Sequence, residues 1–202
     1  MSEILKVADA LVADKDAIRD GWLDAIPFSD LDRKNVDNYC KAIRAIADHA
    51  ASGSIAVDVG VHLGISTAIL AQHSNISRVI AIDPYVPYDQ APNFEYSHDV
   101  ARELFEAHVM RPLGNVTLIR KTSHEAAAEI VDGCAGLVMI DGDHRYEFVK
   151  QDIVDFLPKL VPGGVIAGHD YCDQWGAKRA CDEMFGGPEN MELFPSAHWR
   201  RK

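Results

Sequence analysis

The chain has 202 residues, of which 48% are hydrophobic and 25% charged, and its formal net charge is −11. These values are typical of a globular protein, and the length allows one domain with a substantial core. The acidic balance disfavours a nucleic-acid groove or an anionic membrane surface, so we expect no nucleic acid and no membrane as partners. The sequence has neither an apolar run of membrane-spanning length nor a C-x-x-C pair. We therefore expect a cytoplasmic protein whose cysteines are reduced.

The N-terminal region, residues 1–52, is predicted to be helical. Apolar residues fall on one helical face within residues 4–12, and a second helix is expected over residues 33–49. We expect this extension to pack on the flank of the core, residues 53–202, within a single domain. The alternative is a lid over the site or the interface of a homo-oligomer.

The remaining chain alternates between strand and helix patterns. Short apolar runs typical of buried parallel strands are separated by stretches of helical length. This alternation predicts an α/β fold with a doubly wound, mostly parallel sheet and helices on both faces, ending in a hairpin with one antiparallel strand. Pro162-Gly163-Gly164 is predicted to be a tight turn. The expected strands cover residues 55–59, 78–82, 116–120, 137–140, 165–167, 191–194 and 197–200, and the expected helices cover residues 66–73, 98–110, 123–131, 146–160 and 177–185.

The stretch Ala56–Thr67 combines a buried strand, two glycines and small hydroxylic residues that can open a helix. Glycine lets a backbone turn sharply and approach a ligand closely, and a helix N-terminus presents unpaired N–H groups. The phosphate-binding loop is absent, because no lysine follows Gly64. The dinucleotide pattern G-x-G-x-x-G also fails, because His62 and Ile65 stand at two of its three glycine positions.

What remains is acid-x-Gly-x-x-x-Gly from Asp58 to Gly64, which continues as Gly-x-Ser-Thr to Thr67. It resembles the first motif of class I S-adenosylmethionine-dependent methyltransferases, in the small bacterial branch related to macrolide-sugar O-methyltransferases and cephalosporin-hydroxylase-associated proteins. The resemblance implies a Rossmann-like methyltransferase fold whose seven-stranded sheet ends in an antiparallel hairpin. It also implies S-adenosylmethionine as cofactor, contacted from this motif by Asp58, Gly60, His62, Gly64, Ser66 and Thr67.

Two further strand tips carry candidate cofactor contacts. The second strand ends in Asp83, and a carboxylate there can accept bonds from both ribose hydroxyls, a role that the resemblance also implies. The alternative is that Asp83-Pro84 only forms a turn after the strand. The third strand leads to Ser123, whose position lines the adenine pocket in the resembling family. Ser123 can also cap the next helix, and both roles can hold.

The fourth and fifth strands end in polar clusters that contain Asp141-Gly142-Asp143-His144 and His169-Asp170. Neighbouring parallel strands lie about 4.8 Å apart, so both tips can converge on one ion. Asp141, His169 and Asp170 form an oxygen-rich set with one imidazole, which suits Mg²⁺ or another divalent metal. His169 and Asp170 can both ligate only if the chain turns there, because successive strand residues point to opposite faces.

The resemblance extends to this cluster. Metal-dependent O-methyltransferases carry an acid after the fourth strand and an acidic or amide pair after the fifth. Asp141 and Asp170 match this pattern, whereas His169 departs from the usual carboxylate. In the macrolide-sugar relatives a histidine three residues after the first metal-binding acid is the general base. The resemblance therefore implies that His144 is the base and that Asp141 is catalytic with it. It also implies that Asp141 contacts the cofactor. The alternative is that Asp143 and His144 cap the next helix.

These residues together predict a methyltransferase that transfers a methyl group to the oxygen of a small hydroxylated molecule. Methyltransferases of nucleobase amino groups carry a (D/N/S)-P-P-(Y/F) loop after the fourth strand, and its absence argues against a nucleic-acid substrate. The connection over residues 84–96 is long and is expected to contact substrate or to form a lid. The alternative function is a catalytically inactive, methyltransferase-like protein that binds a ligand. A nicotinamide oxidoreductase is disfavoured by the failed glycine spacing.

Overall fold

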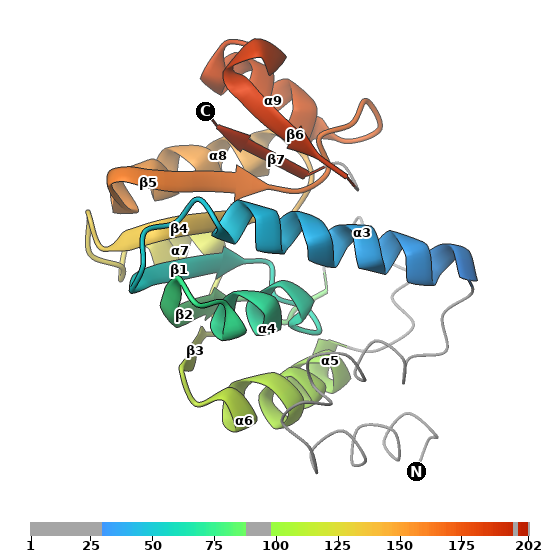
Figure 1. The fold of residues 1–202 in the computed structure, drawn as a ribbon, viewed down its shortest axis with the longest axis vertical. Helices are drawn as coiled ribbons and strands as arrows, with labels where there is room; N and C mark the ends of the chain where they lie inside the picture. The colour runs from blue at the N-terminus through green and yellow to red at the C-terminus, as the bar shows by residue number, and fades with distance from the viewer. Residues whose placement is uncertain (1–29, 88–97, 196–197, 202) are drawn as a thin grey trace.

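The computed structural model describes residues 30–87, 98–195 and 198–201, with side chains from residue 38 onward (Figure 1). The helix predicted over residues 4–12 and most of the connection over residues 84–96 lie outside the described residues. The helix predicted over residues 33–49 is present as α3 (Asp30–Ala47). None of the described helices has the length and apolar character that crossing a bilayer requires.

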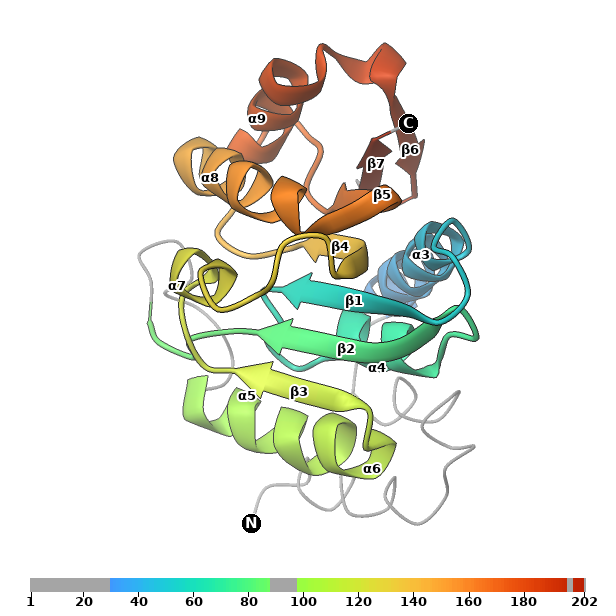
Figure 2. The same ribbon diagram turned by 90° about the vertical axis from the view of Figure 1, so that its left-hand side faces the viewer.

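One sheet contains the strands β1 (Ser54–Val59), β2 (Ile76–Ile82), β3 (Val116–Ile119), β4 (Ala135–Ile140), β5 (Leu160–Gly168), β6 (Met191–Phe194) and β7 (His198–Arg201). Their order is β3-β2-β1-β4-β5-β7-β6 (Figure 2). All pairs from β3 to β5 are parallel, whereas β7 runs antiparallel to β5 and β6. The chain order reverses between β1 and β4, and open α/β sheets bind ligands at such a switch point.

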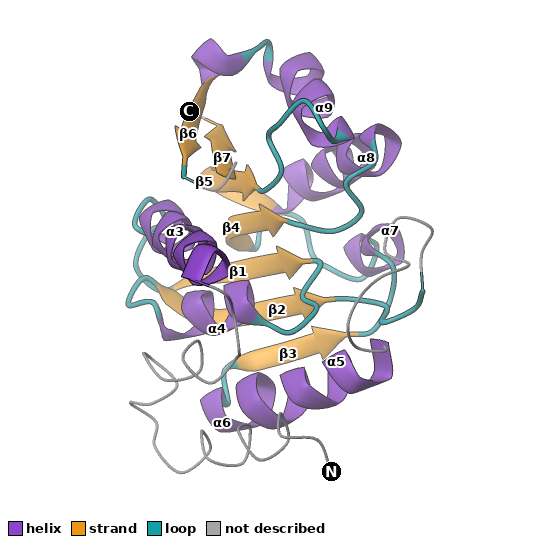
Figure 3. Cartoon of the chain, turned by 90° about the vertical axis from the view of Figure 1, so that its right-hand side faces the viewer, coloured by secondary structure: helices purple, strands orange, loops and turns teal. Residues whose placement is uncertain are grey.

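Helices cover both faces of this sheet (Figures 2 and 3). Successive residues of β4 point to opposite faces: Leu137 and Met139 join the apolar cluster with α3, whereas Val138 and Ile140 join the cluster on the other face. The predicted doubly wound fold with an antiparallel C-terminal hairpin is therefore confirmed. On the α3 face lie α4 (Ile65–Gln72), α5 (His98–Phe105) and α6 (Arg111–Leu113), and on the other face lie α7 (Ser123–Ala127), α8 (Tyr146–Phe156) and α9 (Gly176–Phe185).

Shorter helical turns join some of these elements. A π-helical turn, Glu106–Met110, connects α5 to α6, so the helix predicted over residues 98–110 continues without a break. Two 3₁₀ turns, Leu157–Lys159 and Pro188–Asn190, lead into β5 and β6.

The predicted tight turn at Pro162-Gly163-Gly164 is wrong. These residues belong to β5, and the register with β4 jumps there from the pair Ala135–Leu160 to the pair Leu137–Val165. The extra residues of β5 form a bulge in which Gly163 takes a φ of +79°. A bulge accommodates a proline and a left-handed glycine without ending the strand, because its residues are not held in the ladder.

A close backbone approach at Gly60 determines the geometry of the sheet edge. Gly60 has a φ of +86°, and a Cβ there would lie 2.1 Å from the carbonyl oxygen of Asp141. The Gly60 amide donates to the Ile82 carbonyl at 2.9 Å, and the Asp141 amide donates to the Val59 carbonyl at 2.8 Å. The tips of β1, β2 and β4 are thereby held together, and only glycine fits between them.

The acid of β1 lies behind this loop. Asp58 is fully buried, and its Oδ2 accepts hydrogen bonds from the Ser66 hydroxyl at 2.8 Å and the Thr67 hydroxyl at 2.5 Å. Burial raises the pKa of Asp58 to about 7, although both hydroxyls pull in the opposite direction. Asp58 therefore ties the first turn of α4 to the strand that precedes it.

Replacing Gly60 by alanine is expected to destabilise the fold through both strain and a steric clash. Gly53 is a matched control, since its φ is +81° and a Cβ there would meet nothing within 4 Å. We expect Gly53→Ala to lower the free energy of unfolding by about 1–2 kcal/mol, the cost of left-handed backbone alone. Gly60→Ala should lower it by about 3 kcal/mol or more, because overpacking is added. Equal losses in urea denaturation would contradict the proposed clash.

Asp58 should make a contribution to stability that falls as pH rises. Between about pH 4 and pH 7 the unfolded chain ionises this carboxyl while the folded chain keeps its proton, so stability is lost as pH rises. The effect is at most about 1.4 kcal/mol per pH unit. Asp58→Asn removes it, so the stability of the variant relative to wild type should increase from pH 5 to pH 8 in urea titrations. The exposed Asp99→Asn should run parallel to wild type, and a parallel Asp58→Asn curve would contradict the assignment.

Candidate functional site

A pocket of about 680 Å³ opens at the carboxyl edge of the parallel strands. Its size lies within the range typical of small-molecule sites. Residues that follow five neighbouring strands line it: Thr122 after β3, Asp83 after β2, Gly60 after β1, Asp141 after β4 and His169 after β5. The pocket therefore crosses the switch point, and a single ligand or ligand pair within it contacts several chain segments.

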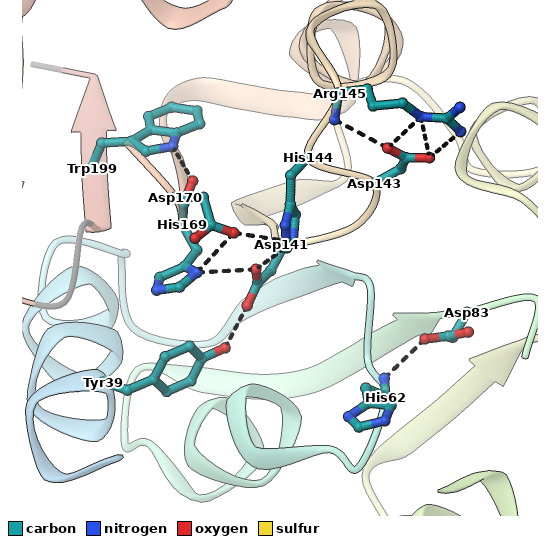
Figure 4. Close-up of polar contacts among 10 residues, drawn as sticks. All are labelled: Tyr39, His62, Asp83, Asp141, Asp143, His144, Arg145, His169, Asp170 and Trp199. Atoms are coloured by element: carbon teal, nitrogen blue, oxygen red, sulfur yellow. Dashed lines mark hydrogen bonds and ion pairs between the residues drawn. The ribbon is translucent and has the colours of Figure 1, made fainter. Parts of the chain in front are cut away.

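Asp83 is held rigidly at one side of this pocket (Figure 4). The amide of His62 donates to its Oδ2 at 2.9 Å, and the amide of Tyr85 donates to its Oδ1 at 2.7 Å. Both donors have left-handed backbone, with φ of +48° at His62 and +52° at Tyr85. The Tyr85 hydroxyl donates to the His62 carbonyl at 2.7 Å, which joins the two turns. Each carboxylate oxygen keeps a lone pair that can accept a further bond from a ligand.

Most of the residues predicted to contact the cofactor line this pocket. Asp58 and Thr67 do not, because both are fully buried and bonded to each other behind the loop. Their observed hydrogen bonds support the loop, and their role as cofactor contacts stays a prediction. The predicted contacts that do line the pocket are Gly60, His62, Gly64, Ser66, Asp83, Ser123 and Asp141.

The cap of α7 is Thr122 and not Ser123. The Thr122 hydroxyl accepts from the Glu125 amide, and the Glu125 side chain accepts from the Thr122 amide, which is a complete capping box. Ser123 is the first residue of the helix and lines the pocket beside Thr122. The signal was present in the sequence, since Thr122 and Glu125 have the spacing of this motif.

Two acids and two histidines meet at the tips of β4 and β5 (Figure 4). His144 Nε2 lies 3.0 Å from Asp170 Oδ2 and 3.8 Å from Asp141 Oδ1. His169 Nδ1 lies 3.2 Å from Asp170 Oδ2 and 3.4 Å from Asp141 Oδ1. Asp170 has a φ of +59°, so the chain does turn after His169, and this turn lets both residues face the same point.

The charges in this cluster stabilise one another. Burial lowers the pKa of His169, but the nearby Asp141 and Asp170 carboxylates outweigh burial and raise that pKa to about 10. Burial also raises the pKa of Asp141. The charge of His169 and hydrogen bonds from His169 and Tyr39 lower it by more, so the pKa of Asp141 lies below its usual value. The raised pKa of His169 and the lowered pKa of Asp141 both favour an ion pair between these two residues.

Tyr39 is a site residue that the sequence analysis missed. It comes from α3, and its hydroxyl donates to Asp141 Oδ2 at 2.7 Å, leaving Oδ1 to face the histidines. Its ring packs against His169, with centroids 5.3 Å apart, and against His198, with centroids 4.7 Å apart. Burial and the charge of Asp141 keep the pKa of Tyr39 well above its usual value, so the phenol remains a donor. Helical spacing indicated only that Tyr39 packs on the core.

The donor set of this cluster fits a divalent ion. One ligand atom each from Asp141, His144 and Asp170 lies within 4.8 Å of the others. Hard carboxylate oxygens with one imidazole suit Mg²⁺, Mn²⁺ or a related ion. The metal ligands predicted from the sequence were Asp141, His169 and Asp170. Both acids recur in this set, in which His144 is the imidazole. His169 lies next to the same carboxylate oxygens.

The chain is similar to known proteins over its central part. The family described as a methyltransferase domain matches residues 57–171, more than half of the chain. Protein y4gI of Sinorhizobium fredii is 30% identical over 126 residues, covering 60% of this chain and 14% of that protein. Protein R132 of Acanthamoeba polyphaga mimivirus is 30% identical over 121 residues, covering 58% of this chain and 51% of that protein. The matched segments thus span about half of R132 and a much smaller part of y4gI.

Solved structures share the fold at low sequence identity. An rRNA methylase from Streptococcus thermophilus has a TM-score of 0.57 at 17% identity, covering 79% of this chain and 91% of that one. Cofactor-bound Rv0187 from MTB has a TM-score of 0.54 at 19% identity, covering 100% and 90%. CalS11, a TDP-rhamnose 3'-O-methyltransferase of calicheamicin biosynthesis, has a TM-score of 0.53 at 16% identity, covering 99% and 92%. These structures establish the fold, and the match over residues 57–171 shows that this chain belongs to the methyltransferase-domain family.

Proposed function

We propose that this protein transfers the methyl group of S-adenosylmethionine to a hydroxyl of a small molecule, with the help of a divalent ion. One observation carries the proposal: the Asp83 carboxylate is fixed at the glycine loop, and the same pocket holds the acid–histidine cluster. A ribose-binding acid and an ion-binding set in one cavity are what a metal-assisted methyltransferase requires.

The cofactor is placed by three strand tips. Asp83 accepts hydrogen bonds from the ribose hydroxyls, because its two oxygens are already oriented by backbone amides. The turn from Gly60 to Gly64 leaves room for the methionine portion beside Asp141. S-adenosylmethionine supplies an activated methyl group with a neutral thioether as leaving group, so the protein mainly has to orient the two reactants. Orientation of this kind can contribute up to roughly 7–11 kcal/mol.

Asp141 and Asp170 would hold the ion together with His169. The ring of His169 packs between the rings of Tyr39 and His198. These contacts orient His169 toward the two acids before an ion binds, so it is better suited to be a ligand than a mobile base. A divalent ion supplies Lewis acidity, which lowers the pKa of a coordinated hydroxyl. Tyr39 orients Asp141 through its second oxygen.

His144 takes the proton of the acceptor. Its side chain is 30% exposed, lines the pocket and meets the Trp175 ring edge-on at 5.6 Å. As the acceptor oxygen bonds to the methyl carbon, the carbon–sulfur bond breaks, its electron pair stays on sulfur, and the hydroxyl proton moves to the imidazole. His144 can accept this proton because it reaches the pocket from the loop after β4 and is partly exposed there, beside the Trp175 ring.

A small acceptor fits this site better than a nucleic acid. The net charge of −11 repels a polyanion, although an rRNA methylase shares the fold. CalS11 acts on TDP-rhamnose, which supports a sugar or another hydroxylated small molecule as acceptor class. Trp175 lines the pocket beside His144 and offers a flat apolar surface to such a ring.

Cofactor binding is tested by calorimetry with S-adenosylhomocysteine. Wild type should bind it saturably, and Asp83→Asn should weaken binding by about tenfold or more, because charged hydrogen bonds to the ribose are lost. Asp99→Asn, an exposed change on α5, should leave binding unchanged. Absence of binding to wild type would overturn the proposal. Binding without methyl transfer to any hydroxylated acceptor would instead favour an inactive ligand-binding protein.

Ion binding is tested by titration with Mn²⁺. Asp170→Asn and His169→Ala should weaken Mn²⁺ binding by at least about tenfold, whereas His144→Ala should retain it and lose turnover. Asp173→Asn, an exposed acid paired with Lys178, is the control. Turnover that is indifferent to EDTA would remove the ion from the proposal. Loss of binding in His144→Ala, with retention in His169→Ala, would make His144 the ligand and exclude it as base.

A further inference from the structure

One buried acid in the pocket has no role in the chemistry described above. Asp152 lies on α8 and is 3% exposed, yet it lines the same pocket as Thr122 and Ser123. Burial raises the pKa of Asp152 to about 7, while a hydrogen bond from the Ser123 side chain acts in the opposite direction. Leaving a carboxylate inside an apolar pocket is costly unless donors satisfy its charged form.

The carboxylate of Asp152 lies between α7 and the β4 tip: the Ser123 side chain bonds to it, and a Cβ on Gly142 would lie 3.7 Å from its Oδ2. The strand order β3-β2-β1-β4 places Asp83 at the β2 tip, with the glycine loop and the acid–histidine cluster on its β1 and β4 side. A nucleoside held by its ribose at Asp83, with its sulfur near the cluster, must therefore direct its base toward β3. Ser123 marks that end, and α7 and α8 lie next to each other there (Figure 2).

The tip of β3 provides no carboxylate of its own. Its residues Arg120, Lys121, Thr122 and Ser123 offer cations and hydroxyls. The exocyclic amino group of adenine donates two hydrogen bonds and needs an acceptor. Asp143 also lines the pocket, but its carboxylate is engaged by Arg145. Asp152, from a helix about 30 residues downstream, is then the acid that can accept from this amino group.

We propose that Asp152 recognises the exocyclic amino group of adenine and makes the site selective for adenosyl over inosyl ligands. This inference rests on the proposed function. The carboxylate accepts a hydrogen bond from the amino group while Ser123 holds it in place. Inosine carries a carbonyl oxygen at that position, which a buried carboxylate repels. A site built on a hydrogen bond to a ligand amine rejects the analogue that lacks it, because its own polar group is left unpaired.

The test compares S-adenosylhomocysteine with S-inosylhomocysteine by calorimetry above about pH 8, where Asp152 is ionised. Wild type should bind the adenosyl compound at least about tenfold more tightly. Asp152→Asn should reduce this ratio to near one or reverse it, because an amide can donate to the inosine oxygen. Asp155→Asn is the matched control, since Asp155 lies on the same helix and binds His124 of α7 but does not line the pocket; its ratio should equal that of wild type.

The outcomes separate this inference from the function on which it rests. Equal binding of both compounds by wild type would overturn it, and that measurement does not depend on any variant folding. A parallel loss of both affinities in Asp152→Asn, with the ratio retained, would also overturn it and leave Asp152 as a support for α7. Binding of neither compound by wild type would overturn the methyltransferase proposal itself.

Discussion

The contact between Gly60 and the backbone of Asp141 is the constraint on which the site depends. It brings β1 and β4 together at the point where the sheet reverses direction, and hydrogen bonds from Gly60 and Asp141 fix the three central tips in register. Because a side chain at position 60 would occupy the space of the Asp141 carbonyl, a single packing event places both the glycine loop and Asp141. The proposed cofactor side and the proposed acceptor side of the pocket are therefore not independent features.

The pocket concentrates acidic side chains, which would favour a cationic ligand. Asp83, Asp141, Asp152 and Asp170 all line it, and His169 is the cation that balances the pair at β4 and β5. A divalent ion in the proposed set would take over the balancing role of His169, which would then release its proton. A sulfonium is also a cation, so the same field favours the proposed methyl donor over its neutral product.

Much of the fold and part of the site could be predicted from the sequence, because the relevant signals are local. The alternation of apolar runs with helical stretches predicted the sheet. The place of Asp83, Asp141 and Asp170 directly after strands predicted that they line the site. Tyr39 could not be predicted, since it meets Asp141 across 102 positions and its helical spacing indicates only packing. Asp152 was missed for the same reason. The bulge in β5 was mistaken for a turn, because proline and glycine have the same local preference in both.

The hydrogen bond from α3 to Asp141 has a consequence for how the site forms. Tyr39 meets Asp141 across 102 positions of the chain, so this acid is fully oriented only after α3 has packed on the sheet. The matched family segment begins at residue 57 and leaves Tyr39 outside it. Without α3 the chain would keep the glycine loop and Asp83, but it would lose the donor that orients Asp141.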